Sequence, residues 1–225
     1  MRILLSWSSG KDSAWALHVL EQQHPGCVRA LLSTVNIDAG RVAMHGVRRE
    51  LLEAQATAAR LPLWEVPIPH PCTNEVYEAQ MRDACARAVN AGFTHVAFGD
   101  LFLEDVRRYR EERLAGTGLT PLFPLWGMRT ESLARDMIRS GVRAKLSVVD
   151  TRKVDRSFAG REFDAALLED LPGAVDRCGE NGEFHTFVYG GPMFDTAIAL
   201  ELGQTVVREA FVYIDLCPIR AESSV

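Results

Sequence analysis

Short apolar runs alternate with stretches of helical periodicity along the first half of this chain. The runs are rich in Val, Ile and Leu, as strands buried on both faces of a parallel sheet usually are. In the stretches between them, apolar residues recur every three or four positions, which predicts helices with one buried face. Alternating strands and helices predict an α/β fold built on a doubly wound parallel sheet. The predicted strands are residues 3–5, 28–35, 63–68 and 94–98, and the predicted helices are 14–20, 47–60 and 75–90.

The second half of the chain has a different pattern. A charged helix over 104–114 closes the first half, and we place a boundary near Gly127, between domains of residues 1–126 and 127–225. The second domain should be smaller and α+β, because its last strands alternate apolar and polar residues as antiparallel strands do. We expect residues 221–225 to be frayed. The elements predicted here are helices 130–140 and 160–171, and strands 143–150, 183–189 and 205–216.

Composition narrows the class of protein. Of the 225 residues, 47% are hydrophobic, which suffices for a packed core, yet no apolar run approaches the length of a membrane span. The chain begins directly with a predicted strand and shows no signal peptide, so we expect a cytoplasmic protein. The formal net charge of −5 argues against a nucleic-acid partner. The five cysteines form no CxxC pair, which indicates neither a disulfide framework nor a zinc site.

A tight loop, Ser-Ser-Gly-Lys-Asp-Ser at residues 8–13, joins the first predicted strand to the first predicted helix. Such a turn points backbone N–H groups and the positive end of the helix dipole at one spot, which suits a phosphate. Gly10 permits backbone geometry that a Cβ would hinder, and Lys11 adds a cation. The alternative is an ordinary strand-to-helix turn with a serine cap. Hydroxyl groups come from Ser8, Ser9 and Ser13.

The spacing in this loop matches neither of the two commoner phosphate-binding motifs, G-x-x-x-x-G-K-[ST] and G-x-G-x-x-G. It resembles instead the PP-loop, S-G-G-x-D-S, of ATP pyrophosphatases, which cleave ATP between the α and β phosphates. In doubly wound sheets, ligands bind beyond the carboxyl ends of the strands. Candidate groups at those ends are the loop 8–13, residues 34–38, residues 70–74 and Gly99-Asp100.

A second stretch, residues 176–194, is dense in chemically active groups. Glu180 and Glu183 flank Gly182, and His185 follows at once. Glycines on either side of Glu180 permit a sharp turn that would aim both carboxylates into one cleft, with Glu183 and His185 on one face of the next strand. Such a group could bind ammonium, hold Mg²⁺ or move protons. The alternative is a polar hairpin whose Glu and His side chains face water.

Together the two stretches resemble the diphthine–ammonia ligase family, a branch of the PP-loop ATPases. Two positions depart from that family. Ser9 stands where the family has Gly, and His185 stands where the diphthine-specific members carry an acidic residue. Further similar segments are 44–47, 74–78, Gly99-Asp100, Arg107 with Glu111, 124–126 and 179–183, the last close to the signature G-E-x-G-E.

The resemblance implies an N-terminal domain of the adenine nucleotide alpha hydrolase-like (HUP) type and a C-terminal domain that binds the acceptor. It implies ATP-dependent amidation, in which a substrate carboxylate attacks the α-phosphate, pyrophosphate leaves, and ammonia attacks the acyl-adenylate. In the named members the substrate is diphthine, the modified histidine of a translation elongation factor. For this chain the implied acceptor is a carboxylate, with a protein as one option, and a homodimer is left open.

Roles follow for individual residues. The loop 8–13 would hold the β and γ phosphates, with Lys11 neutralising charge as pyrophosphate departs. Residues 34–38, beginning with Thr34, would line the adenine. Asp12 and Asp100 are the Mg²⁺ candidates; capping a helix is the alternative for each, and ribose contact a further one for Asp100. The remaining assignments are His45 to a phosphate, Asn74 and Tyr77 to the acceptor, and Glu180, Glu183 and His185 to the acceptor or ammonia.

Plainer alternatives exist for some of these side chains. His45 could be a solvated loop residue, and Asn74 and Tyr77 could cap and pack their own helix. For the whole chain, one alternative is a module that senses ATP or AMP without turnover. Another is a tRNA-modifying PP-loop enzyme, against which the acidic charge and the lack of paired cysteines count.

Overall fold

The computed structural model describes residues 1–43, 45–69 and 71–219. Met44, His70 and the last residues of the chain therefore lie outside the described residues. Three sequence expectations are affected: the family-like segment 44–47 at its first residue, the strand-end group 70–74 at its first residue, and the frayed end 221–225.

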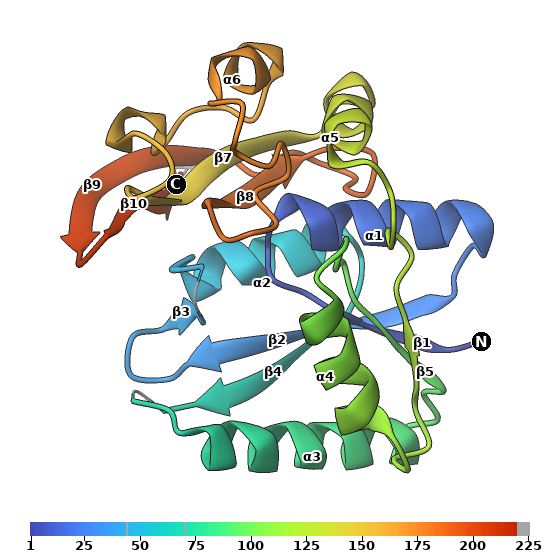
Figure 1. Cartoon of the computed structure of the whole chain (residues 1–225). Helices are drawn as coiled ribbons and strands as arrows, with labels where there is room; N and C mark the ends of the chain where they lie inside the picture. The colour runs from blue at the N-terminus through green and yellow to red at the C-terminus, as the bar shows by residue number, and fades with distance from the viewer. Residues whose placement is uncertain (44, 70, 220–225) are drawn as a thin grey trace, which may run out of the picture.

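A mostly parallel sheet of six strands forms the first half of the chain (Figure 1). Its central strand, β1, pairs in parallel with β2 on one side and with β5 on the other. The order in which strands are added to the sheet therefore reverses at β1. Ligand sites in such sheets lie at the carboxyl ends beside this reversal. The predicted α/β fold is thus confirmed. The strands are β1 (Ile3–Ser6), β2 (Val28–Asn36), β3 (Arg41–Val42), β4 (Leu63–Ile68), β5 (His95–Ala97) and β6 (Thr120–Leu122).

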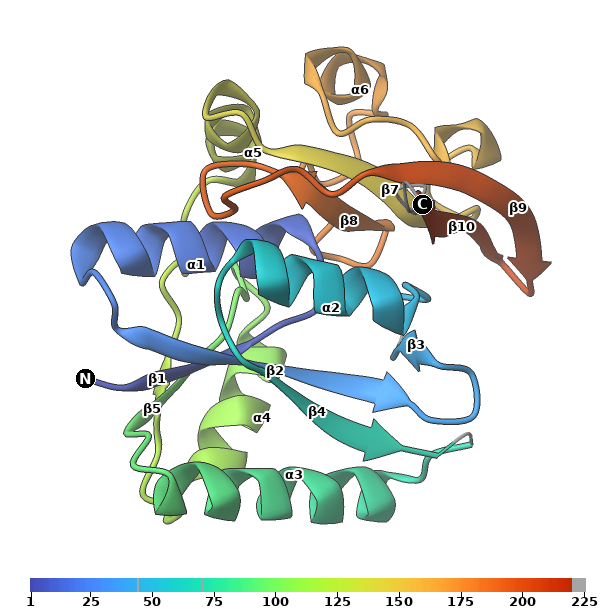
Figure 2. The same cartoon turned by 180° about the vertical axis from the view of Figure 1, so that it is seen from behind.

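Helices cover both faces of this sheet (Figures 1 and 2). On one face lie α1 (Lys11–Gln23) and α2 (Arg49–Ala58), and on the other α3 (Asn74–Asn90) and α4 (Glu104–Leu114). The alternation of side chains along a strand explains the two layers, because Ile3 and Leu5 of β1 join the core beneath α1 while Leu4 joins the core above α3.

A second, antiparallel sheet in the order β8-β7-β10-β9 packs on the outer side of α1 and α2 (Figure 2). Because α1 lies between two sheets, five consecutive residues, 13–17, are buried, as expected of a helix covered all round. The elements of this half are α5 (Thr130–Arg139), β7 (Arg143–Asp150), the 3₁₀ turn η1 (Arg156–Phe158), α6 (Ala165–Asp170), β8 (Phe184–Gly190), β9 (Leu200–Arg208) and β10 (Phe211–Pro218).

The two halves share one cluster of buried apolar side chains, which includes Leu51 of α2 and Phe187 of β8. Ion pairs also join them: Asp215 of β10 accepts hydrogen bonds from Arg41 and Arg48. These bonds, the Arg48 bond foremost, lower the pKa of Asp215 to about 2 against the opposing effect of burial. The domain boundary near Gly127 stays a prediction.

Several elements differ from the sequence predictions. The strand predicted over 205–216 is two strands, β9 and β10, and Glu209 adopts φ +52° at the turn between them. That turn contains no Gly or Pro, so the apolar pattern continues across it and predicts a single strand. The helix predicted over 160–171 shrinks to the six residues of α6, because the Asp164 side chain caps it at the N–H of Leu167. The strands β3 and β6 were not predicted, because neither is long enough to show a pattern of apolar and polar residues.

The helix caps also differ. Thr73, and not Asn74, caps α3, because its side chain accepts a hydrogen bond from the Val76 N–H. Thr130, the first residue of α5, donates its hydroxyl to Asp176, which ties α5 to the loop before β8. In the part of the chain that the structure describes, no helix is both long and apolar enough to cross a bilayer.

Candidate functional site

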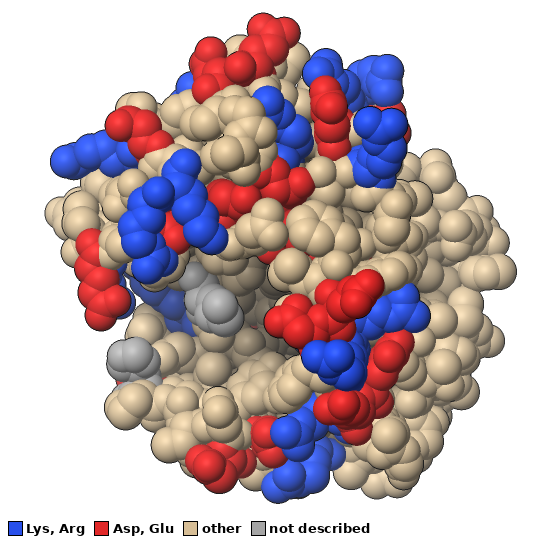
Figure 3. Space-filling view, in the orientation of Figure 1, with Lys and Arg blue, Asp and Glu red and all other residues tan. Residues whose placement is uncertain are grey.

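A cavity of about 310 Å³ lies at the carboxyl ends of β1 and β5, below the second sheet. On the face seen in Figure 3, the surface is hollowed between that sheet and α4. Loop 8–13, the segment after β5 and the turn before β8 converge there, although they are far apart in sequence. Of the predicted site residues, the lining includes Ser8, Gly10, Lys11, Asp12, Ser13, His45, Gly99, Asp100, Glu180 and His185.

The loop after β1 owes its shape to Ser9. Ser9 is fully buried and adopts φ +69°, a left-handed conformation that favours glycine. The family's Gly at this position therefore has a conformational reason. Gly10, in contrast, has extended backbone that any residue adopts, so our expectation of special backbone geometry there is wrong. Gly10 instead relieves crowding, since a Cβ there would lie 3.3 Å from the Thr186 carbonyl oxygen, a tight contact.

Gly99 allows β5 to end directly against the first turn of α1. A Cβ at Gly99 would lie 2.8 Å from the Asp12 carbonyl carbon and 2.9 Å from the Ser13 nitrogen, both backbone atoms. Real Cβ contacts are not that short, so only glycine fits. The sequence identified Gly99 as a strand-end residue, and the structure supplies the steric reason.

Lys11 is the buried cation of the site. Its side chain is only 2% exposed, and its ammonium group donates to the Asp12 carboxylate at 2.8 Å and to the Cys178 carbonyl. Burial alone would lower the pKa of Lys11, but nearby negative charge, led by Asp12, outweighs it and the pKa is raised. Lys11 thus stays charged and links α1 to the turn before β8.

Asp12 faces the cavity from the first turn of α1. Burial raises the pKa of its carboxyl group, against the opposing effect of Lys11. One carboxylate oxygen binds Lys11, while the other, Oδ1, is buried and has no hydrogen-bond partner among the described residues. The helix-capping alternative for Asp12 is wrong, because Gly10 is the N-cap of α1 and no side chain caps it.

Asp100 lines the opposite wall and is held by Arg110 of α4. The Arg110 guanidinium donates to both carboxylate oxygens, with 3.1 Å between Nη2 and Oδ1. Asp100 does not cap the following helix, since the N-cap of α4 is Leu103. The sequence placed Arg110 only in a run of arginines, and nothing in that run distinguishes it from its neighbours.

The side chains of the two glutamates in the G-E-N-G-E turn point to different places. Glu180 lines the cavity, and its Oε1 accepts a 2.8 Å hydrogen bond from the Leu101 N–H. Burial raises the pKa of Glu180 to about 7, which the Leu101 bond partly opposes. Glu183 is 3% exposed and binds the Asp176 N–H and the Asn181 amide, so it holds the turn together. The expectation that both carboxylates enter one cleft is not met.

His45 and His185 meet at the cavity wall. Their ring centroids lie 4.5 Å apart. Burial lowers the pKa of His185 to about 4, and burial followed by the charges of His185 and Lys11 lowers the pKa of His45 well below its ordinary value. Both imidazoles are therefore neutral at pH 7. The solvated-loop alternative for His45 is wrong, because its Nδ1 is buried, without a hydrogen-bond partner among the described residues.

The structure does not bring every predicted residue to this cavity. Thr34 lies within β2, where its carbonyl accepts from the Ala43 N–H, and it does not line this cavity. Its contact with adenine stays a prediction. Asn74 is exposed at the start of α3. Tyr77 lines a separate, neighbouring pocket.

Sequence reasoning missed three further residues that shape the site. Thr186 accepts a 3.1 Å hydrogen bond from the Lys11 N–H, and Cys178 supplies the carbonyl that binds the Lys11 ammonium. Gln55 of α2 is fully buried and bridges the Ser9 and Val188 carbonyls, which locks the loop to β8. Thr186 and Cys178 could have been found from their position beside the G-E-N-G-E turn. Gln55 belongs to an ordinary helical pattern, which gives no sign of its role.

Ser9→Gly should stabilise the protein by about 1 kcal/mol, because glycine relieves the left-handed strain and removes a buried hydroxyl that has no partner among the described residues. Urea unfolding of both forms would measure it. Ser132→Gly inside α5, where the backbone is helical, should instead destabilise by about 0.5 kcal/mol. A Ser9→Gly protein that is less stable than the parent would contradict the strain argument.

Glu180→Gln should change how stability depends on pH. In the parent protein, a pKa raised to about 7 means that the folded state holds a proton that the unfolded state has released, so stability falls as pH rises from about 4.5 to 7. Glutamine can still accept from Leu101, and it removes this loss. We expect the variant to gain stability over the parent at pH 8 and to lose that gain near pH 4. A pH-independent difference in urea midpoints would refute the assignment.

Comparison with known proteins agrees with this arrangement. Residues 129–220 match the family model described as the diphthamide synthase C-terminal domain. The diphthine–ammonia ligase of Rattus norvegicus is 31% identical over 124 residues, which cover 52% of this chain and 46% of the rat protein. That of Danio rerio is 33% identical over 113 residues, covering 47% of this chain and 44% of the fish protein.

The aligned part of the chain spans a little under half the length of these curated relatives. Both matches carry the name that the two sequence motifs had suggested, and the family model falls on the half that contains the G-E-N-G-E turn. The resemblance to the diphthine–ammonia ligase family, drawn from the sequence, is confirmed.

Proposed function

We propose that the chain is an ATP-dependent, AMP-forming amide ligase. The single observation that carries this proposal is the meeting of loop 8–13 and the G-E-N-G-E turn in one cavity, where the ammonium group of Lys11 bridges the two. Loop 8–13 is suited to bind phosphates, and the G-E-N-G-E turn carries side chains that are suited to contact a second substrate. The names of the relatives supply the reaction class, ligation with ammonia.

The triphosphate would lie at the N-terminus of α1. Lining atoms from Gly10 to Ser13 belong to the cap and first turn of this helix, where the positive end of the helix dipole stabilises an anion. An ammonium group has three N–H donors, and Asp12 and Cys178 accept from Lys11. The remaining donor is available to a phosphate oxygen, so Lys11 can offset charge on the departing pyrophosphate.

Magnesium fits the same end of the cavity. Oδ1 of Asp12 is buried without a partner among the described residues, and a hard oxygen ligand of this kind suits Mg²⁺. Asp100 already pairs with Arg110, so Asp12 is the stronger candidate. No group of three or more His, Cys, Asp or Glu in the described part of the chain could hold a metal, as expected if substrate phosphates complete its coordination. Bound Mg²⁺ would neutralise phosphate charge.

The reaction would proceed in two balanced steps. An acceptor carboxylate oxygen forms a bond to the α-phosphorus while the bond from that phosphorus to the pyrophosphate oxygen breaks. Ammonia then forms the C–N bond, AMP leaves with the carboxylate oxygen, and the nitrogen loses a proton. Glu180 is suited to accept that proton, because a pKa of about 7 lets it exist in both forms near neutral pH. His45 and His185, both neutral, would present ring nitrogens without adding charge.

The acceptor itself is proposed only as a carboxylate, free or on a protein. The relatives are named for diphthine, but His185, one of the two departures from the family pattern noted in the sequence, lies on the cavity wall.

Product analysis tests the proposal. The protein is incubated with ATP, Mg²⁺, ammonium and a cell extract from its source, and AMP is resolved from ADP. We expect AMP and pyrophosphate that depend on the extract. ADP with inorganic phosphate would contradict the chemistry, and tight ATP binding without turnover in any extract fraction would favour a nucleotide sensor.

A further inference from the structure

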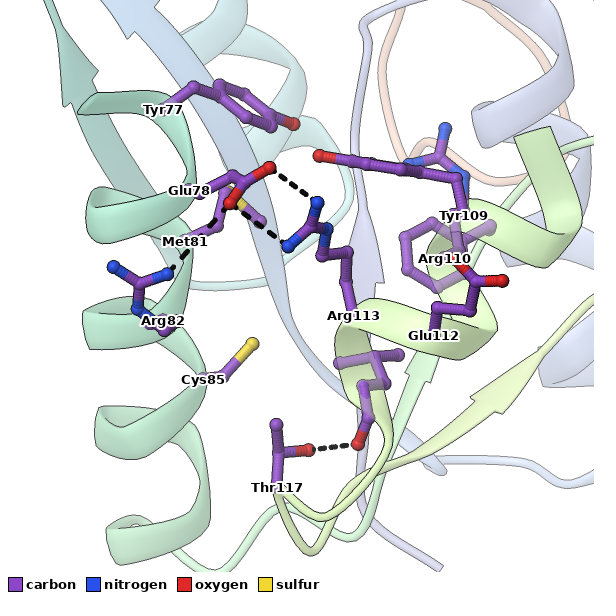
Figure 4. A pocket seen from close by; sticks show the side chains of 12 residues that line it. Tyr77, Glu78, Met81, Arg82, Cys85, Tyr109, Arg110, Glu112, Arg113 and Thr117 are labelled. Atoms are coloured by element: carbon purple, nitrogen blue, oxygen red, sulfur yellow. Dashed lines mark hydrogen bonds and ion pairs between the residues drawn. The ribbon is translucent and has the colours of Figure 1, made fainter. Parts of the chain in front are cut away.

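A second cavity, of about 170 Å³, lies between α3 and α4 beside the nucleotide cavity. In Figure 4 the side chains of both helices turn toward each other across it. Tyr77, Met81 and Cys85 contribute the α3 wall, and their spacing of four residues puts them on one face of that helix. Tyr109 and Arg113 contribute the α4 wall. We call this the α3–α4 pocket.

The interior of this pocket is apolar and aromatic. Met81, Cys85, Phe98 and the ring of Tyr77 surround a space similar to the cavity of about 150 Å³ that accommodates benzene in another protein. The hydroxyls of Tyr77 and Tyr109 approach one end of the pocket (Figure 4), and neither has a hydrogen-bond partner among the residues that the structure describes. A flat ring would find aromatic and sulfur contacts here.

The charges at the rim are largely matched within the protein. Arg113 donates to both oxygens of Glu78, with N–O distances of 2.6 and 3.0 Å. Arg82 lies 4.0 Å from the same carboxylate (Figure 4). Because Glu78 is already neutralised, the pocket selects for an apolar body more than for a charged one.

The α3–α4 pocket and the nucleotide cavity share two wall residues, Phe98 and Arg110. The Arg110 guanidinium stacks 4.4 Å from the centre of the Phe98 ring and uses two N–H groups to bind Asp100. A guanidinium has five N–H donors, so others are left for a ligand. They lie at the border between the two cavities, where a carboxylate could bind.

We propose that the α3–α4 pocket is the acceptor subsite and takes a ring-bearing carboxylate, a proposal that rests on the proposed ligase function. The ring occupies the space between Tyr77, Met81 and Phe98, and a short linker brings the carboxylate to Arg110 at the edge of the nucleotide cavity. From there it is positioned to approach the α-phosphate. A free molecule and a side chain of a protein acceptor would make the same contacts here.

Binding of 3-phenylpropionate, followed by ligand-detected NMR, tests the proposal without ATP cleavage. Cys85→Phe fills the pocket from its wall, whereas Ala86→Phe adds the same ring to the exposed side of α3. We expect the parent and Ala86→Phe proteins to bind the probe equally, and Cys85→Phe to bind it at least about tenfold more weakly. ATP affinity should be unchanged in both variants.

Arg110→Gln provides a second variant. It should weaken 3-phenylpropionate binding but leave binding of the neutral analogue 3-phenylpropanol unchanged, because only the carboxylate contacts Arg110. Equal binding of 3-phenylpropionate to the parent and Cys85→Phe proteins, or no binding to the parent, would overturn the proposal. Absence of AMP formation would count against the proposed function alone, since probe binding requires no turnover.

Discussion

Lys11→Met is expected to reduce pyrophosphate release by about 100-fold or more and to destabilise the protein by about 3 kcal/mol. Methionine keeps much of the length of the side chain but removes the ammonium group that binds Asp12 and the Cys178 carbonyl. The activity loss follows because no cation is left to offset charge on the leaving group. The stability loss follows because the buried Asp12 carboxylate loses its cation. Turnover assays and urea unfolding measure the two effects.

The double variant Lys11→Met/Asp12→Asn separates these effects. Removing the orphaned carboxylate charge should restore part of the stability lost in Lys11→Met, while pyrophosphate release stays low. Parent-like activity in either variant would contradict the role given to Lys11. Equal destabilisation of the single and double variants would contradict the ion-pair argument instead.

Gly99→Ala is expected to destabilise the protein by about 3 kcal/mol, because the new methyl group would lie 2.8 Å from the backbone of Asp12. Backbone atoms at the start of a buried helix cannot move as a flexible side chain can. The end of β5 and the first turn of α1 must therefore separate, which distorts the proposed phosphate site. Thermal unfolding and ATP binding would both report the change.

Gly173→Ala is the matched control. A methyl group at Gly173 would meet no heavy atom within 4 Å apart from those of its two chain neighbours, so the same chemical change should be nearly neutral there. A Gly99→Ala protein as stable as Gly173→Ala, with unaltered ATP affinity, would show that β5 and α1 do not need this close approach.

Much of the fold could be predicted because its signals are local. The bounds of β4 and β7 agree with the predicted 63–68 and 143–150, since short apolar runs and flanking Gly or Pro residues mark them. Those of α4 agree with the predicted charged helix over 104–114. The β9–β10 hairpin could not be predicted in the same way. Its turn at Glu209 has no glycine, and the left-handed backbone there is set by strand pairing.

The same distinction between local and three-dimensional signals applies to the residues of the site. Loop 8–13, Gly99 and Glu180 could be located from motifs, because their residue types are required by the backbone or by the ligand. The direction of Glu183 could not be predicted, because the N–H groups it binds belong to a folded turn. Arg110 is distinguished from the arginines around it only by Asp100 and Phe98, which approach it in three dimensions.

Exchange of labelled pyrophosphate into ATP tests the central claim most directly, because it reports reversible adenylation before ammonia enters. The assay contains the protein, ATP, Mg²⁺ and an acceptor-containing extract fraction, with ammonium left out. The predicted result is label in ATP that depends on the acceptor fraction and disappears in Lys11→Met. Accumulation of ADP and phosphate without exchange would contradict an adenylating ligase built on loop 8–13 and the G-E-N-G-E turn.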